Sequence, residues 1–195
     1  MKAVRVAMAV VSMTNNPEYE ALRADLQHPS QKGMKPLIDR FLREPEYRAT
    51  VVYMALSEDY PFAWRASWVM KFAFRQNPST WTPFLERITS ALPELKTHQQ
   101  IGSFIPSLTK CDLSEEQGDR LLNLAIDELE KERETEYTKA HAVDVLHKYV
   151  SHYPELAGEF CLIVERAVET AQKPYFRNKA LKRVKQWSTK YIDRS

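Results

Sequence analysis

Two tryptophans and two basic residues share one side of a predicted helix over residues 62–76, and their types suit the binding of a partner. In the segment FAWRASWVMKFAFRQ, Trp64 and Trp68 are four residues apart, and Lys71 and Arg75 continue the same line. Positions three or four apart lie on one face of an α-helix. Aromatic rings beside cations can stack on nucleic-acid bases, or can anchor a peptide while the cations hold an anionic group.

The opposite face of the same helix is also apolar, with Phe62, Ala66, Val69 and Ala73. A helix that is apolar on two sides is either packed between neighbours or exposes one side for binding. In the first case the tryptophans belong to an ordinary core and the basic tips reach out to water. The sequence leaves both interpretations open, and Arg65, between the two faces, fits either.

The C-terminal stretch is strongly basic. Residues 173–195 hold eight Lys and Arg residues against one acid, whereas residues 112–136 hold ten acids against three bases. Within this stretch Lys179, Lys182 and Lys185 could neutralise phosphates, and binding would then weaken steeply with salt. The alternative is a solvated outer face that caps the last unit of a repeat protein.

Signatures of catalysis and metal binding are missing from the sequence. It contains no G-x-S-x-G, P-loop, H-E-x-x-H or dinucleotide-binding pattern. His141 and His152 share a helix face, but 11 residues correspond to about 16 Å of helical rise, too far for one metal ion. His141 and Asp144, three residues apart, are expected to form a surface pair. We therefore expect no catalytic residue, metal site or cofactor, and we favour a non-catalytic protein.

The elements that position these residues are predicted to be helices throughout. Only four glycines occur, and many of the eleven prolines lie where an apolar helical pattern begins or ends. A capping box, Ser114 with Gln117, marks one helix start. A fifth helix starts near Pro83, a ninth opens at Pro154 and a tenth follows Pro174. The other predicted helices cover about 16–27, 34–43, 46–57, 62–76, 94–109, 115–132 and 136–151.

Two series of helices alternate along the chain, and the helices of both series recur at nearly the same spacing. In the first series small residues are spaced by 36, 40 and 38 positions, at Ala66, Gly102, Ala142 and Ala180. In the second series leucines are spaced by 37 and 40 positions, at Leu85, Leu122 and Leu162. Two interleaved series predict stacked helical hairpins, in the range of HEAT and armadillo repeats (roughly 40–47 residues) or of the shorter tetratricopeptide unit (about 34). The expected fold class is all-α, an α-α superhelix of about ten helices.

Three segments, WRASWVMKF, KAHAVDVLHKY and RNKALKRVKQW, resemble HEAT or armadillo-type repeats, and the resemblance covers about residues 32–192. Within that style the chain is similar to the HEAT-like DNA alkylation-repair glycosylases, small helical solenoids with tryptophans and basic residues on a concave surface that faces DNA. This resemblance implies that Trp64, Arg65, Trp68 and Lys71 are the positions to test. That family places an aspartate beside its tryptophans, whereas residues 62–78 contain no Asp or Glu.

The chain is expected to form a single helical-repeat domain over residues 13–195. Residues 1–12 are a possible N-terminal appendage, because Met13 begins a segment with the character of a natural start. Cys111 and Cys161 have no close spacing, which favours a reducing compartment and a cytoplasmic location. No stretch approaches the roughly 20 apolar residues of a membrane span, so no membrane partner is expected.

The function predicted from the sequence is a non-catalytic interaction module that binds a peptide or protein on its concave face. The alternative is a nucleic-acid-binding or DNA alkylation-repair-like protein that uses the tryptophans and the basic residues. The sequence leaves the oligomeric state and the identity of the partner open. The candidate binding residues are Trp64, Arg65, Trp68, Lys71, Arg75, Lys179, Lys182 and Lys185.

Overall fold

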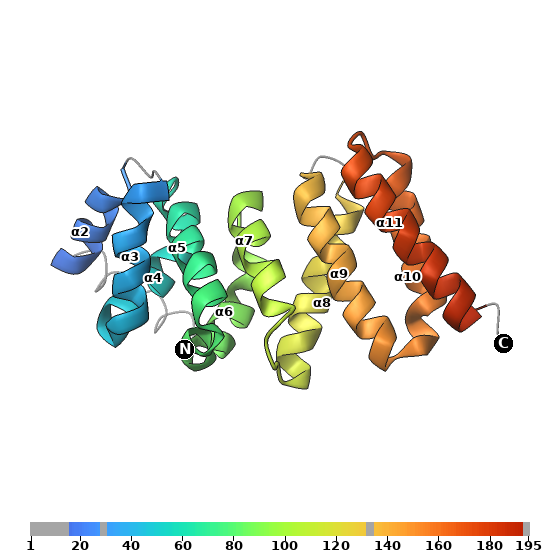
Figure 1. Cartoon of the computed structure of the whole chain (residues 1–195), viewed down its shortest axis with the longest axis horizontal. Helices are drawn as coiled ribbons and strands as arrows, with labels where there is room; N and C mark the ends of the chain where they lie inside the picture. Colours follow the sequence, from blue (N-terminus) through green and yellow to red (C-terminus); the bar gives the residue numbers. More distant parts are fainter. Residues whose placement is uncertain (1–15, 28–30, 132–134, 193–195) are drawn as a thin grey trace. The chain divides into compact units, whose positions relative to one another are not determined.

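The computed structural model describes residues 16–27, 31–131 and 135–192, and in these residues it contains ten α-helices and no strand. This confirms the predicted all-α helical repeat (Figure 1). The possible appendage, residues 1–12, lies outside the described residues. The helices are α2 (Pro17–Asp25), α3 (Gln31–Arg43), α4 (Pro45–Ala55), α5 (Phe62–Gln76), α6 (Leu85–Ala91), α7 (His98–Leu108), α8 (Glu115–Glu130), α9 (Glu136–His152), α10 (Ala157–Glu169) and α11 (Pro174–Trp187).

Local signals mark several of the helix starts. The Asn16 side chain accepts a hydrogen bond from the Glu18 amide and caps α2, and both halves of the Ser114–Gln117 capping box are formed at α8. Two helices start later than predicted. A 3₁₀ turn, η2 (Leu92–Glu94), precedes α7, and another, η3 (Pro154–Leu156), precedes α10. A third, η1 (Pro78–Phe84), leads into α6.

The chain folds as two compact units. Among the described residues, the first unit contains those up to 88 together with 95–103, and the second contains 89–94 and those from 104 onward. In the first unit α4 packs on α2, α3 and α5, and α3 also packs on α5. In the second unit α8 packs on α9 and α10, and α11 packs on α9 and α10. In the view of Figure 1, α9 and α11 lie side by side in front of α8 and α10.

The small residues of the first repeat series are buried. Ala66, Ala142 and Ala180 are fully buried in α5, α9 and α11, and Gly102 is buried in α7. The leucines of the second series fall in α6, α8 and α10, the helices that alternate with them. A small side chain allows a neighbouring helix to approach closely, so the repeat period marks where helices pack.

Two tryptophans form the centres of the cores. Trp81 is 1% exposed and donates a hydrogen bond from Nε1 to the Met70 carbonyl oxygen at 3.2 Å. Trp187 is fully buried on the apolar stripe of α11, together with Phe176, Ala180 and Val184. Regular helical spacing would place Tyr191, four residues after Trp187, on the same stripe, but it is only half-buried. The cause is a π-helical turn, η4 (Ser188–Ile192), which changes the helical register after α11.

Candidate functional site

Helix α5 has a fully packed face and an outward face that is partly open to solvent, a difference that its sequence leaves undecided. Ala66, Val69 and Ala73 are fully buried against the neighbouring helices. The outward residues are half-buried, apart from Arg75, which is exposed. We call this outward set the α5 ridge, and it comprises Trp64, Trp68, Lys71, Phe72 and Arg75.

The aromatic rings of the α5 ridge are ordered by contacts within the helix. Trp64 and Trp68 meet edge to face, with ring centroids 4.5 Å apart and an interplanar angle of 75°. The Arg75 guanidinium lies over the Phe72 ring, 5.3 Å from its centroid. These aromatic–aromatic and cation–π contacts hold the rings in place without covering them fully. The Trp64 indole N–H has no acceptor within the part of the chain that the structure describes.

Arg65 is engaged elsewhere in the first unit. Its guanidinium donates hydrogen bonds to the carbonyl oxygens of Leu26 and Gln27, at 2.8 and 3.0 Å, where α2 ends. It also lies 5.4 Å from the centroid of the Trp64 ring. Arg65 therefore satisfies helix-end carbonyls and supports Trp64.

The exposure of the four tryptophans bears on the choice between core and binding surface. Trp81 and Trp187 are at most 1% exposed, and both indole N–H groups donate a hydrogen bond inside the protein. Trp64 and Trp68 keep part of their surface open to solvent. An aromatic pair that is half-buried on an outward helix face is typical of the anchor positions of interfaces.

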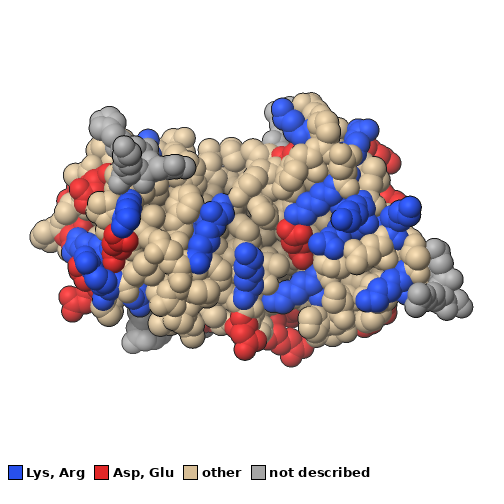
Figure 2. All heavy atoms as spheres, viewed as in Figure 1, with Lys and Arg blue, Asp and Glu red and all other residues tan. Residues whose placement is uncertain are grey.

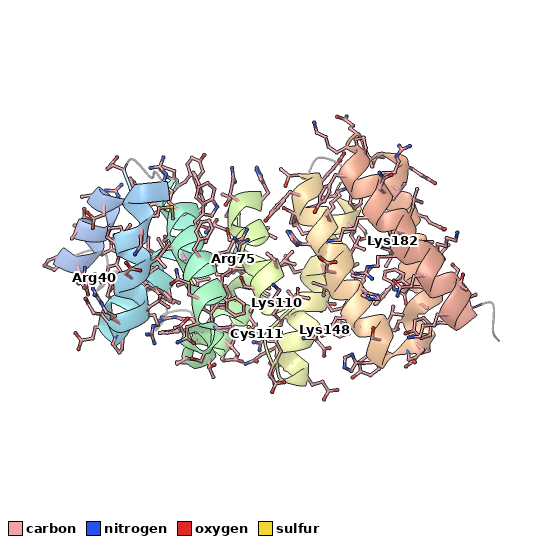
Figure 3. All side chains as sticks on the ribbon, in the orientation of Figure 1. Arg40, Arg75, Lys110, Cys111, Lys148 and Lys182 are labelled. Atoms are coloured by element: carbon pink, nitrogen blue, oxygen red, sulfur yellow. The ribbon has the colours of Figure 1, made fainter. Side chains whose placement is uncertain are left out.

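The predicted lysines of α11 differ in their surroundings. The Lys179 ammonium pairs with the Asp144 carboxylate of α9 at 2.6 Å, whereas Lys182 and Lys185 are exposed. The predicted pair of His141 and Asp144 is confirmed, at 3.6 Å. Burial alone would raise the pKa of Asp144, but hydrogen bonds from His141 and Lys179 outweigh it and lower that pKa. Figure 3 labels Lys182 on α11 and Lys148 from α9.

His147 lies between two hydrogen-bond donors of α11. Trp187 Nε1 donates to His147 Nδ1 at 2.9 Å, and the Arg183 guanidinium lies 3.0 Å from His147 Nε2. Neither donor can accept a hydrogen bond, and a neutral imidazole accepts at only one nitrogen. Arg183 also donates to Gln186 at 2.9 Å, so Arg183 keeps a hydrogen-bond acceptor when His147 Nε2 carries the proton. The contacts therefore favour neutral His147.

This geometry predicts that the protein loses stability as the pH falls below about 6.5. Burial lowers the pKa of His147, and Arg183 acts in the same direction. The unfolded chain therefore takes up this proton at a higher pH than the folded chain, so acid favours unfolding. We expect His147→Gln to reduce the pH dependence of the unfolding free energy between about pH 7 and 5, measured with urea. An unchanged pH dependence would show that His147 does not carry the effect.

Several residues that form hydrogen bonds between helices were not identified from the sequence, although their spacing would have revealed them. Their hydrogen-bond partners lie about one repeat away: 40 residues for Trp187 and His147, and 36 for Arg183 and His147. Lys148 likewise donates to the carbonyl oxygens of Thr109 and Cys111, 39 and 37 residues away. A search for polar residues separated by the repeat period would have paired these positions.

The two sets of predicted residues fall in different units of the fold. The α5 ridge belongs to the first unit and the lysines of α11 to the second, so the structure describes two separate candidate surfaces. Within residues 16–27, 31–131 and 135–192, no three His, Cys, Asp or Glu side chains are grouped as metal ligands. None of the helices in these ranges combines the length and apolar content needed to cross a membrane.

Comparison with known proteins identifies the family. A family model described as a HEAT repeat domain matches residues 22–186. No curated protein and no solved structure matches the chain. The matched segment includes helices from both units and agrees with the alternating helix series that the sequence predicts. The chain therefore belongs to the HEAT repeat domain family.

Proposed function

We propose that the protein is a non-catalytic interaction module and that the α5 ridge binds a peptide segment of a protein partner. HEAT repeats stack helical hairpins into extended surfaces on which other molecules dock. The observation that supports this site is the half-buried pair Trp64 and Trp68, on the outward face of a helix whose other face is fully packed. Tryptophan is among the residues that most often dominate binding energy.

The chemistry of the α5 ridge favours a segment with an apolar side chain next to an acidic one. The apolar side chain would pack on the two indole rings, and the exposed Arg75 would pair with the carboxylate. The Trp64 indole N–H offers a donor for a backbone carbonyl of the bound segment. That nitrogen is covered in the free protein, so this hydrogen bond requires a side-chain rotation.

The proposal is tested by selecting peptides from a random library against the full chain and measuring their affinities. We expect the selected peptides to carry an acidic residue near an aromatic or large aliphatic residue. Trp68→Ala should weaken their binding about 30-fold, the effect of a loss of about 2 kcal/mol. Because Trp68 is half-buried, the unfolding free energy should fall less in this variant than in Trp81→Ala.

The matched control is Tyr153→Ala, which removes an aromatic side chain that is 48% exposed in the second unit. This control should leave peptide affinity unchanged within about twofold, since surface substitutions away from a site have small effects. The proposal is wrong if the two alanine variants weaken binding equally. It is also wrong if Trp68→Ala destabilises the fold as much as Trp81→Ala while peptide affinity is retained.

A further inference from the structure

The outward surface of α9 and α11 concentrates basic and aromatic side chains. Figure 2 shows Lys and Arg side chains gathered over these two helices. From Pro174 to Ile192, α11 and η4 carry six Lys and Arg residues and no acid. We call the set that faces outward or toward the α9–α11 boundary the α9/α11 face, and it comprises Tyr137, Asp144, Tyr175, Lys179, Lys182, Arg183 and Lys190.

The α9/α11 face has four basic side chains and one acidic side chain, so its net charge is 4 − 1 = +3. Asp144 neutralises Lys179 at 2.6 Å. Arg183 contacts the neutral groups of His147 and Gln186, and Lys190 lies over the Tyr191 ring at 4.7 Å. Contacts with neutral groups hold these side chains without removing their charge. The positive charge therefore remains available to an anionic partner.

Two tyrosines lie at one end of the α9/α11 face. Tyr137 and Tyr175 begin α9 and α11, with 46% and 56% of their surface exposed. Burial raises the pKa of Tyr175, and the nearby Asp144 and Tyr137 act in the same direction. The nearby Glu136 carboxylate already accepts hydrogen bonds from the backbone amides of Gln172 and Lys173, at 2.5 and 2.7 Å. These neutral amides do not remove the Glu136 charge, so with this carboxylate counted the surroundings of the exposed rings have a net charge of 4 − 2 = +2.

We propose that the α9/α11 face binds single-stranded nucleic acid. The phosphates contact Lys182, Arg183 and Lys190, and the bases stack on Tyr137 and Tyr175. This site is separate from the α5 ridge and goes beyond the proposed peptide binding. An acidic peptide would also pair with the cations, but it offers aromatic faces only where its sequence contains them, whereas every base of a nucleic-acid strand has a face that can stack. The combination of a cationic track with exposed rings favours a nucleic-acid strand.

The test is fluorescence anisotropy of the full chain with a labelled single strand of about 20 nucleotides, at about 50 and 200 mM salt. Three phosphates, contacted by Lys182, Arg183 and Lys190, predict a slope of about −2 for log K against log salt, since the slope is about −0.7 per phosphate for single strands. This slope corresponds to a loss of roughly 20-fold in affinity between the two salt concentrations. Lys182→Glu should weaken binding and flatten the slope, whereas Tyr175→Ala should weaken binding and leave the slope unchanged.

The matched control is Arg166→Glu, which makes the same charge change at an exposed position of α10 in the same unit. It should reduce affinity much less than Lys182→Glu, because Arg166 is not part of the α9/α11 face. Equal losses in the two variants, or no saturable binding at the lower salt concentration, would overturn the proposal. Tighter binding of a poly-glutamate competitor than of the strand would also overturn it. Peptide binding at the α5 ridge is measured with different variants, so the two proposals fail separately.

Discussion

Replacing Trp187 with alanine is expected to lower the free energy of unfolding by about 3–5 kcal/mol, the range for removing a large aromatic side chain from a core. Trp187 is fully buried on the face of α11 that also holds the buried Phe176, Ala180 and Val184. The substitution leaves a large cavity and also leaves His147 Nδ1 without its hydrogen-bond donor. The measurement is urea denaturation followed by circular dichroism, compared with the unsubstituted chain.

Trp187→Phe separates the two contributions. Phenylalanine keeps most of the ring volume but cannot donate to His147. This variant should lose about 1–2 kcal/mol of unfolding free energy, from one lost hydrogen bond and a small cavity. If the alanine and phenylalanine variants lost the same unfolding free energy, the cavity would not be the main cause of the destabilisation. If Trp187→Ala cost less than about 1 kcal/mol, this part of α11 would not pack as the structure shows.

The second large effect is expected at Gln100, a buried polar residue of α7. Its side-chain amide donates to the carbonyl oxygens of Ala55 and Ser57, at 3.0 and 3.1 Å, where α4 ends. Its Oε1 accepts a hydrogen bond from the Thr97 hydroxyl at 2.7 Å. Gln100→Leu removes the donor and leaves the two carbonyls unpaired. We expect a loss of about 2–4 kcal/mol in unfolding free energy, since each unsatisfied buried group costs about 1–3 kcal/mol.

Gln100→Glu provides a sharper version of this test. A carboxylate cannot donate to the carbonyls of Ala55 and Ser57, and its charge is unfavourable beside the C-terminal end of α4. The glutamate variant should therefore be less stable than the leucine variant at pH 7. At about pH 4 a protonated glutamate can donate one hydrogen bond, which should narrow the difference. If glutamate proved as stable as glutamine at pH 7, the two hydrogen bonds would not support the fold.

The sequence predicted the helices well because their determinants are local. Apolar residues at helical spacing, prolines at helix starts and the Ser114 capping box act within a few residues. The predictions failed where two local outcomes have similar energies. The turn that starts at Pro154 forms a 3₁₀ helix in place of the first turn of α10, and residues 95–97 before α7 have no regular secondary structure. After Trp187 a π-turn moves Tyr191 off the apolar stripe of α11.

The sequence by itself determined the all-α repeat, its period and the shared helix face of Trp64 and Trp68, because helical spacing fixes those features. The packing of the neighbouring helices decided that this face stays partly open to solvent. Only the tertiary structure decided which charges stay available. Lys179 is neutralised by Asp144, 35 residues away, Arg65 is held by hydrogen bonds to carbonyl oxygens at the end of α2, and Lys182 remains exposed. These outcomes depend on helices about one repeat apart, whose packing brings side chains together. A helical pattern gives the direction of each side chain, but it does not name the partner in the neighbouring helix.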